Sequence, residues 1–428
     1  METMSAGSGI RTATEWPQIV FVSAIAALVV LRVLIPVAVL AAAPRRFPLL
    51  PAYHYAPLNG DSFAYYQAVT NMFASFNGVF DGWIGVGSAG LLASFCAAAW
   101  ILWTAGVRWL AILLPALAIS LILAVLVHDT ASPAAGVIGW PLAWALPLLP
   151  FPLLHLSVTP DRAFPPGLAL SLIANAATVI ATARIGLRVS GRRSIGLTAA
   201  GLYATWPIWV GVVAGEQAWQ NGQWLIDVGL HLYTEPLSTA LFVVSLDLLL
   251  DPRASASVAV VAGLLVGFDT AVKLTNGFLA AALLILVVLR SGWRSGAIFG
   301  LGAIVSVPIV VGYWPQGYAR PSFGNHVDGG LYQLRFVSMN ARTSTIFTGV
   351  MLLVLLPLAL VGLAQIRGWF FRSILVVPIV VTIASYCAYY YTAQHPRFYY
   401  VVLPLVFVLQ AAGAQTICER IGRQRPRM

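Results

Sequence analysis

The stretch PQIVFVSAIAALVVLRVLIPVAVLAAA, residues 17–43, decides the fold class. A membrane-spanning helix needs about 20 mainly apolar residues, and this run exceeds that length. It is too long for a signal-peptide core and has no clear cleavage site, so we interpret it as a retained span. The same character continues along all 428 residues, of which 60% are hydrophobic and 9% charged. Soluble domains carry about 25% charged residues. Residues 1–428 are therefore expected to form one integral membrane domain of the all-α polytopic class.

Further apolar windows follow the first one. With it, they lie at 17–43, 86–104, 108–127, 137–157, 167–187, 195–214, 231–250, 256–272, 275–290, 295–314, 346–366, 372–392 and 397–417. Several are short or broken by proline, so they predict a bundle of about 11–13 transmembrane helices. Two long gaps, at 44–85 and 315–345, predict large loops.

The arginines orient the predicted bundle. Most cations lie in short loops beside apolar windows, such as RIGLRVSGRRS at 184–194, and in the basic tail 418–428. Cytoplasmic loops are enriched in Lys and Arg, so these segments are expected in the cytoplasm of a cell whose plasma membrane holds the chain. Both long loops then fall outside, together with five acidic residues: Asp161, Glu216, Asp227, Glu235 and Asp328. Two cytoplasmic termini require an even number of spans, and 137–157, with four prolines, is the weakest window.

The first external loop, 44–85, contains a predicted juxtamembrane helix. Asn59-Gly60 is a turn signal, and Asp61 is a good N-cap for the residues that follow. Apolar side chains recur at helical spacing from Phe63 to Phe76, which is typical of a helix lying in the membrane interface. Asp61 has two interpretations. It is only a helix cap, or it is a carboxylate held at the membrane surface as a base or a metal ligand.

Three more stretches bring ionisable residues to the predicted outer face. Glu235 opens an apolar window in YTEPLSTALF, 233–242; Lys273 and Asp269 lie between two short windows in GFDTAVKLTNGFL, 267–279; and Arg397 opens the last window in HPRFYYVVLPL, 395–405. Ionisable residues at membrane depth are unfavourable and tend to be functional. The alternatives are a carboxylate placed for the helix dipole, an i,i+4 Lys–Asp pair joining two helices, and an arginine that anchors its span at the interface.

Taken in order, these stretches resemble the polyprenyl-dependent integral membrane glycosyltransferases of the GT-C class. Relatives include protein O-mannosyltransferases, aminoarabinose transferases and envelope glycosyltransferases of actinobacteria. The matching segments are GDSFAYYQAV (60–69), FPPGLALSLIANAAT (164–178), RVSGRRSIGLTAAGLYATWP (188–207), YTEPLSTALF, GFDTAVKLTNG and HPRFYYVVLPL. The resemblance covers the layout of nearly the whole chain, and it rests on the order of motifs that are each weak alone. It implies a GT-C-like helical bundle.

The resemblance also implies an activity. Asp61 would be the general base of an inverting transfer from a polyprenyl-phosphate-linked sugar to an acceptor hydroxyl, on a glycan, lipid or protein, at the outer face. The donor phosphate would be bound by Arg397, Lys273 and His395, and the sugar by Glu235, Glu216, Tyr233, Trp219 and Trp224. The first loop has a single Asp where some relatives have two acidic residues, so dependence on a divalent metal stays open. The chain also lacks the soluble C-terminal domain of larger members.

Other classes fit the sequence less well. The charges are not gathered into a nucleic-acid-binding patch, no nucleotide-binding or zinc-protease motif occurs, and the three cysteines have no metal-ligand spacing. The main alternative is a transporter or flippase of a lipid or a lipid-linked sugar, which predicts ionisable residues in the middle of spans or paired broken helices. A structural or assembly subunit would not need Asp61, Glu235, Lys273 and Arg397 where they are.

Overall fold

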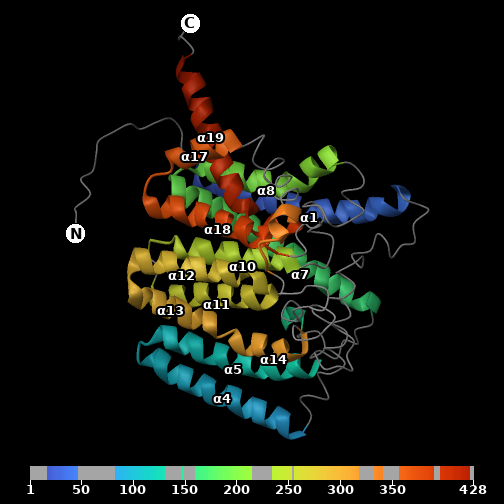
Figure 1. Ribbon diagram of the computed structural model, residues 1–428, viewed down its shortest axis with the longest axis vertical. Coiled ribbons are helices and arrows are strands. Elements are labelled where there is room, and N and C mark those ends of the chain that lie inside the picture. Colours follow the sequence, from blue (N-terminus) through green and yellow to red (C-terminus); the bar gives the residue numbers. More distant parts are fainter. Residues whose placement is uncertain are drawn as a thin grey trace.

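The computed structural model describes residues 17–46, 82–130, 146–148, 160–214, 234–252, 255–317, 332–340, 356–389 and 396–424. Regular structure in these ranges is helical, and one isolated bridge joins Tyr332 to Tyr389. The helices are α1 (Gln18–Arg46), α4 (Gly82–Thr104), α5 (Arg108–Thr130), α7 (Pro160–Ser190), α8 (Arg193–Ala214), α10 (Thr234–Leu249), α11 (Ala256–Val272), η4 (Leu274–Asn276), α12 (Gly277–Ser291), α13 (Trp293–Ile304), α14 (Val307–Gly317), α17 (Leu356–Gln365), α18 (Trp369–Cys387), η7 (Pro396–Val402) and α19 (Leu403–Gln424) (Figure 1).

The all-α polytopic class is confirmed. Eight segments of the described residues are long and apolar enough to cross a membrane, and α11 and α17 are shorter apolar helices. Large apolar side chains such as Ile19, Trp100 and Leu289 are exposed on the helices, where a membrane protein meets lipid. Of the window 137–157 the structure describes only residues 146–148, and the juxtamembrane helix predicted in 44–85 lies outside the described residues.

Helices pack both against their neighbours in sequence, as in α4–α5, α7–α8 and α10–α11, and against helices one further along, as in α11–α13 and α17–α19. In Figure 1, α4, α5 and α10–α14 lie in near-parallel rows. Small residues allow close approach within the rows, because a Cβ added to Gly263 or Gly267 of α11 would overlap backbone oxygens of α13. A Cβ on Gly413 of α19 would likewise overlap the backbone oxygen of Leu358 in α17. These glycines are therefore required by packing and not by turns.

One end of the bundle carries the arginine-rich helix ends, and we call it the basic end. Arg188 of α7 pairs with Asp247 of α10, at 3.0 Å, and with Asp251 just after it, at 2.7 Å. A cavity of about 370 Å³ is lined there by Trp109 at the start of α5, and by Asp251 and Arg290. The ends of α7, α10 and α12 and the start of α5 thus lie together.

The opposite ends of these helices lie together at the other side of the bundle. Thr130, Pro160, Thr234 and Val272 lie opposite the basic end, at what we call the far end. The helices that flank the window 137–157 are α5, which ends at the far end, and α7, which begins there. This matches an even number of spans in which that window does not add a crossing. In α1, Leu28 approaches Gly201 of α8 and Arg32 approaches Tyr203, so α1 runs in the same direction as α8, toward the far end.

Candidate functional site

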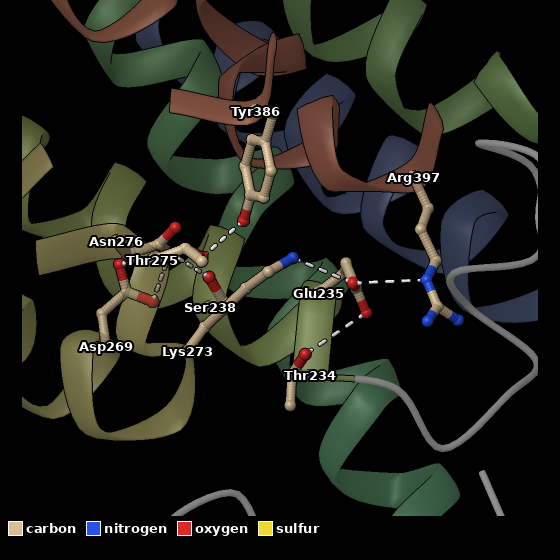
Figure 2. Close-up of polar contacts among 9 residues, drawn as sticks. All are labelled: Thr234, Glu235, Ser238, Asp269, Lys273, Thr275, Asn276, Tyr386 and Arg397. Atoms are coloured by element: carbon tan, nitrogen blue, oxygen red, sulfur yellow. Dashed lines mark hydrogen bonds and ion pairs between the residues drawn. The ribbon is translucent and has the colours of Figure 1, made fainter. Parts of the chain in front are cut away.

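Three of the predicted site residues meet at the far end, and we call Glu235, Lys273 and Arg397 the charge cluster (Figure 2). Lys273 Nζ lies 2.9 Å from Glu235 Oε1, and Arg397 Nε lies 3.6 Å from the same oxygen. They come from the start of α10, the break between α11 and α12, and η7. The three side chains are buried, with Glu235 only 3% exposed.

The local sequence explains how Glu235 and Lys273 reach this point. Pro236 lies in the first turn of α10, where its missing N–H leaves no hydrogen bond unmade, and Glu235 lies at the positive end of the helix dipole. Lys273 has φ −145° and ψ 96°, which ends α11 and turns its side chain off the helix. A short 3-10 turn, η4, then leads directly into α12.

Two aromatic rings lie beside the ammonium group of Lys273. Its Nζ lies 4.7 Å from the ring centroid of Phe398 and 5.5 Å from that of Tyr386. The two rings are stacked, with centroids 5.0 Å apart and planes 15° from parallel. Cation–π contacts of this kind are worth about 2 kcal/mol or more when they are desolvated. Lys273 is therefore held by one carboxylate and two aromatic faces.

Asp269 is bound separately from Lys273. Asn276 Nδ2 lies 3.0 Å from each carboxylate oxygen of Asp269 and 2.7 Å from Ser238 Oγ of α10. The alternative of an i,i+4 pair between Lys273 and Asp269 is therefore not what the structure has. The two residues share only the hydrogen bond from the backbone N–H of Lys273 to the backbone oxygen of Asp269, at 2.8 Å.

Part of the long loop 315–345 lies against the cluster side of the bundle. Asn340 is fully buried and donates to the backbone oxygens of Tyr386, at 3.3 Å, and Cys387, at 2.9 Å. These carbonyls belong to the last turn of α18, where the oxygen of Tyr386 also accepts from the backbone N–H of Tyr389, at 3.3 Å. The sequence interpretation did not single out Asn340, because an asparagine in a polar loop gives no sign of its partner.

The other predicted site residues lie outside the described residues: Asp61, Glu216, Trp219, Trp224, Tyr233 and His395. Within the described ranges, no three His, Cys, Asp or Glu side chains form a group that could hold a metal ion.

A second buried polar centre adjoins the charge cluster, and sequence reasoning missed it. We call Arg32, Asn175, Tyr203 and Tyr400 the arginine network. Arg32 Nη2 donates to Asn175 Oδ1 at 3.0 Å and to Tyr400 Oη at 2.8 Å, and Tyr203 donates to the same Asn175 oxygen at 2.9 Å. The available signal was an arginine in the middle of the first apolar run, which tends to be functional.

The two centres are joined through η7. Arg397 and Tyr400 are three residues apart on this 3-10 helix, and side chains at that spacing lie on the same face. The charge cluster and the arginine network are thus neighbours within the bundle, with the network on the inner parts of α1, α7 and α8. No protein-family model, curated protein or solved structure matches this chain, so its function is inferred from the arrangement of its own residues.

Proposed function

We propose that the chain is an inverting glycosyltransferase that moves a sugar from a polyprenyl phosphate to an acceptor hydroxyl at the outer face of the plasma membrane. The observation that carries the proposal is the charge cluster. Its three residues come from separate stretches of sequence, 233–242, 267–279 and 395–405. In the fold, Lys273 and Arg397 both lie against the carboxylate of Glu235. Since loops at the basic end carry the arginines, the positive-inside tendency puts the cluster on the extracytoplasmic side.

The charges of the cluster suit a phosphate leaving group. Lys273 and Arg397 supply two cations against the single carboxylate of Glu235, so one positive charge is in excess within these three residues. Burial strengthens electrostatic interactions, because the local dielectric constant is low. Fixed cations aimed at developing negative charge are a common source of transition-state stabilisation. In the proposal Lys273 and Arg397, with His395, stabilise the phosphate as it leaves.

The transfer itself is a single displacement. Asp61 takes the proton of the acceptor hydroxyl while its oxygen attacks the anomeric carbon. The bond from that carbon to the phosphate oxygen breaks, the configuration inverts, and polyprenyl phosphate leaves with the bonding electrons. A well-placed base contributes on the order of 10²- to 10⁴-fold to the rate. In this proposal Glu235, Glu216, Tyr233, Trp219 and Trp224 hold the sugar by hydrogen bonds and stacking.

The experiment that tests the proposal is a transfer assay in membranes with labelled polyprenyl-phosphate sugars. Asp61→Asn should insert normally and lose transfer by about 10²- to 10⁴-fold. Asp161→Asn is the matched control, since it makes the same change at another acidic residue predicted on the same face, and it should keep transfer. Near-normal turnover by Asp61→Asn would remove Asp61 from the role of base.

The same assay examines the donor site. Arg397→Ala should mainly raise the donor concentration needed for half-maximal transfer, because a charge-assisted hydrogen bond of about 1.5–3 kcal/mol is lost. Acceptor dependence should change much less. An unchanged donor dependence would leave Arg397 as an anchor of its span.

One observation favours the alternative, a transporter or flippase of a phosphate-bearing lipid. Arg32 is ionisable, buried and in the middle of the first span, where a transporter is expected to carry such residues. An assay in liposomes that contain a labelled polyprenyl-phosphate sugar and a soluble acceptor sugar distinguishes the two functions. Movement of the lipid between leaflets without transfer supports the transporter, and transfer without movement supports the enzyme.

A further inference from the structure

Arg32 is a buried cation without an anion. It is 1% exposed although it lies on α1, whose side chains elsewhere are largely exposed. No carboxylate of the described residues lies within ion-pair distance of its guanidinium. Its contacts are Asn175 Oδ1, Tyr400 Oη and the face of Tyr203, whose ring centroid is 5.4 Å from Cζ. All three are neutral groups.

The arginine network has more donors than acceptors. Asn175 Oδ1 already accepts hydrogen bonds from Arg32, from Tyr203 and, at 3.4 Å, from Tyr400. Tyr400 and Tyr203 are bonded to each other at 3.0 Å, and the Asn175 amide donates to the backbone oxygen of Ser171. Nε and Nη1 of Arg32 are buried and have no acceptor within the described part of the chain. These two nitrogens carry three N–H groups.

Arg188, in another part of the bundle, shows what is missing. It pairs with two carboxylates, Asp247 at 3.0 Å and Asp251 at 2.7 Å. An unpaired buried charge is strongly unfavourable, so an arginine retained in such a place is expected to meet an anion. The N–H groups left over at Arg32 require an acceptor that is both negative and multivalent.

We propose that Arg32 is the cation of a phosphate-binding site, in which N–H groups of Nε and Nη1 donate to the oxygens of a phosphate group. The guanidinium is the side chain best suited to phosphate, since it presents several donors in a planar fork. Two sources supply such a group: a lipid head group, which would lie beside the exposed apolar surface of α1, and free inorganic phosphate. The site is independent of the glycosyltransferase proposal, since a lipid transporter would use it equally.

Thermal unfolding of the full chain in an uncharged detergent tests the site. Dodecyl phosphate should raise the unfolding midpoint with saturating dependence on its concentration, because a ligand that binds only the folded state stabilises it. Dodecanol, which has the same tail without the charge, should not. Inorganic phosphate distinguishes the two sources of the anion. Stabilisation by both phosphates shows that the free anion is sufficient, whereas stabilisation by dodecyl phosphate alone shows that the lipid tail contributes. No rise with either phosphate would overturn the proposal.

Arg32→Met separates a binding site from a polar contact that merely fastens α1. In the binding site, removing the unpaired charge leaves Asn175, Tyr203 and Tyr400 bonded to one another, so the free variant should be as stable as the wild type or more so. The apparent affinity for dodecyl phosphate should fall at least ~10- to 100-fold. Arg32→Lys keeps the charge without the planar fork of donors, so its apparent affinity for dodecyl phosphate should lie between those of the wild type and Arg32→Met.

Arg188→Met is the matched control, because it removes a half-buried arginine that already has its carboxylates. It should destabilise the protein and leave the response to dodecyl phosphate unchanged. The proposal fails if Arg32→Met does not fold, or folds with the response intact. The first result would make Arg32 a structural contact, and the second would put the phosphate elsewhere.

Discussion

The charge cluster and the arginine network are both buried and both include residues of η7, yet they differ in one respect. The cluster has a carboxylate between its cations, whereas the partners of Arg32 among the described residues are an amide and two phenols. A centre with its counterion present depends on that counterion for stability. A centre without one has donors left over for a ligand. In the cluster, Glu235 therefore helps to hold the helices together as well as facing the proposed donor site, whereas in the arginine network the N–H groups of Arg32 are left for a further anion.

The largest effect is expected from removing the carboxylate of the charge cluster. Glu235→Gln removes the carboxylate that pairs with Lys273 and lies 3.6 Å from Arg397, and should destabilise the protein by about 3–5 kcal/mol. The unfolding midpoint in detergent measures this. Adding Lys273→Met should restore part of the loss, since it removes the cation that Glu235 pairs with at 2.9 Å. If the double variant is no more stable than Glu235→Gln, the two residues are not coupled.

A smaller effect is expected at the hairpin between α11 and α12. Asn276→Leu removes the donor to both oxygens of Asp269 and to Ser238, and leaves a buried carboxylate without that donor. We expect a loss of about 1–3 kcal/mol, measured by denaturation in detergent. Ser238→Ala removes the hydroxyl that contacts both Asn276 and Asp269, but it keeps both contacts from Asn276 to the carboxylate and should lose less. Equal losses in the two variants would show that the carboxylate is not the group that needs Asn276.

The smallest effect is expected in the arginine network. Tyr203→Phe removes one of the donors to Asn175 Oδ1, while Arg32 still occupies that oxygen. The loss should be about 1 kcal/mol or less. Thermal unfolding provides the measurement, and Tyr400→Phe, at a residue that contacts Arg32 directly, is the comparison. A loss as large as that of Glu235→Gln would remove the distinction between the two centres.

Much of the fold follows from the sequence because the bilayer sets one length for every span. Windows such as 17–43, 108–127 and 256–272 coincide with α1, α5 and α11 to within a few residues. The break at Lys273 was predicted from the ionisable residues between two short windows. Its partner was not predicted, because the i,i+4 rule applies to a continuous helix, and the extended backbone of Lys273 directs its side chain to Glu235.

Partners across the bundle are the part that sequence cannot supply. Arg32 and Tyr400 are separated by 368 residues, and nothing local to either indicates the other. A single arginine changes the mean hydropathy of a long apolar window very little, so the average over the window does not reveal Arg32. Asn340 is similar, since its role depends on the end of a helix more than 40 residues away, to which it donates.

The distance between α1 and η7 along the chain has a consequence for biosynthesis. Arg32 enters the membrane with α1, and a lone arginine at the centre of a span costs about 2.5–3.5 kcal/mol on insertion scales. Asn175 is made 143 residues later, and Tyr400 is made 368 residues after Arg32. Arg397, the second cation of the cluster, is made with Tyr400 in η7. Until the ribosome has delivered η7, the nascent protein carries both centres incomplete, so this short helix commits the chain to its assembled form.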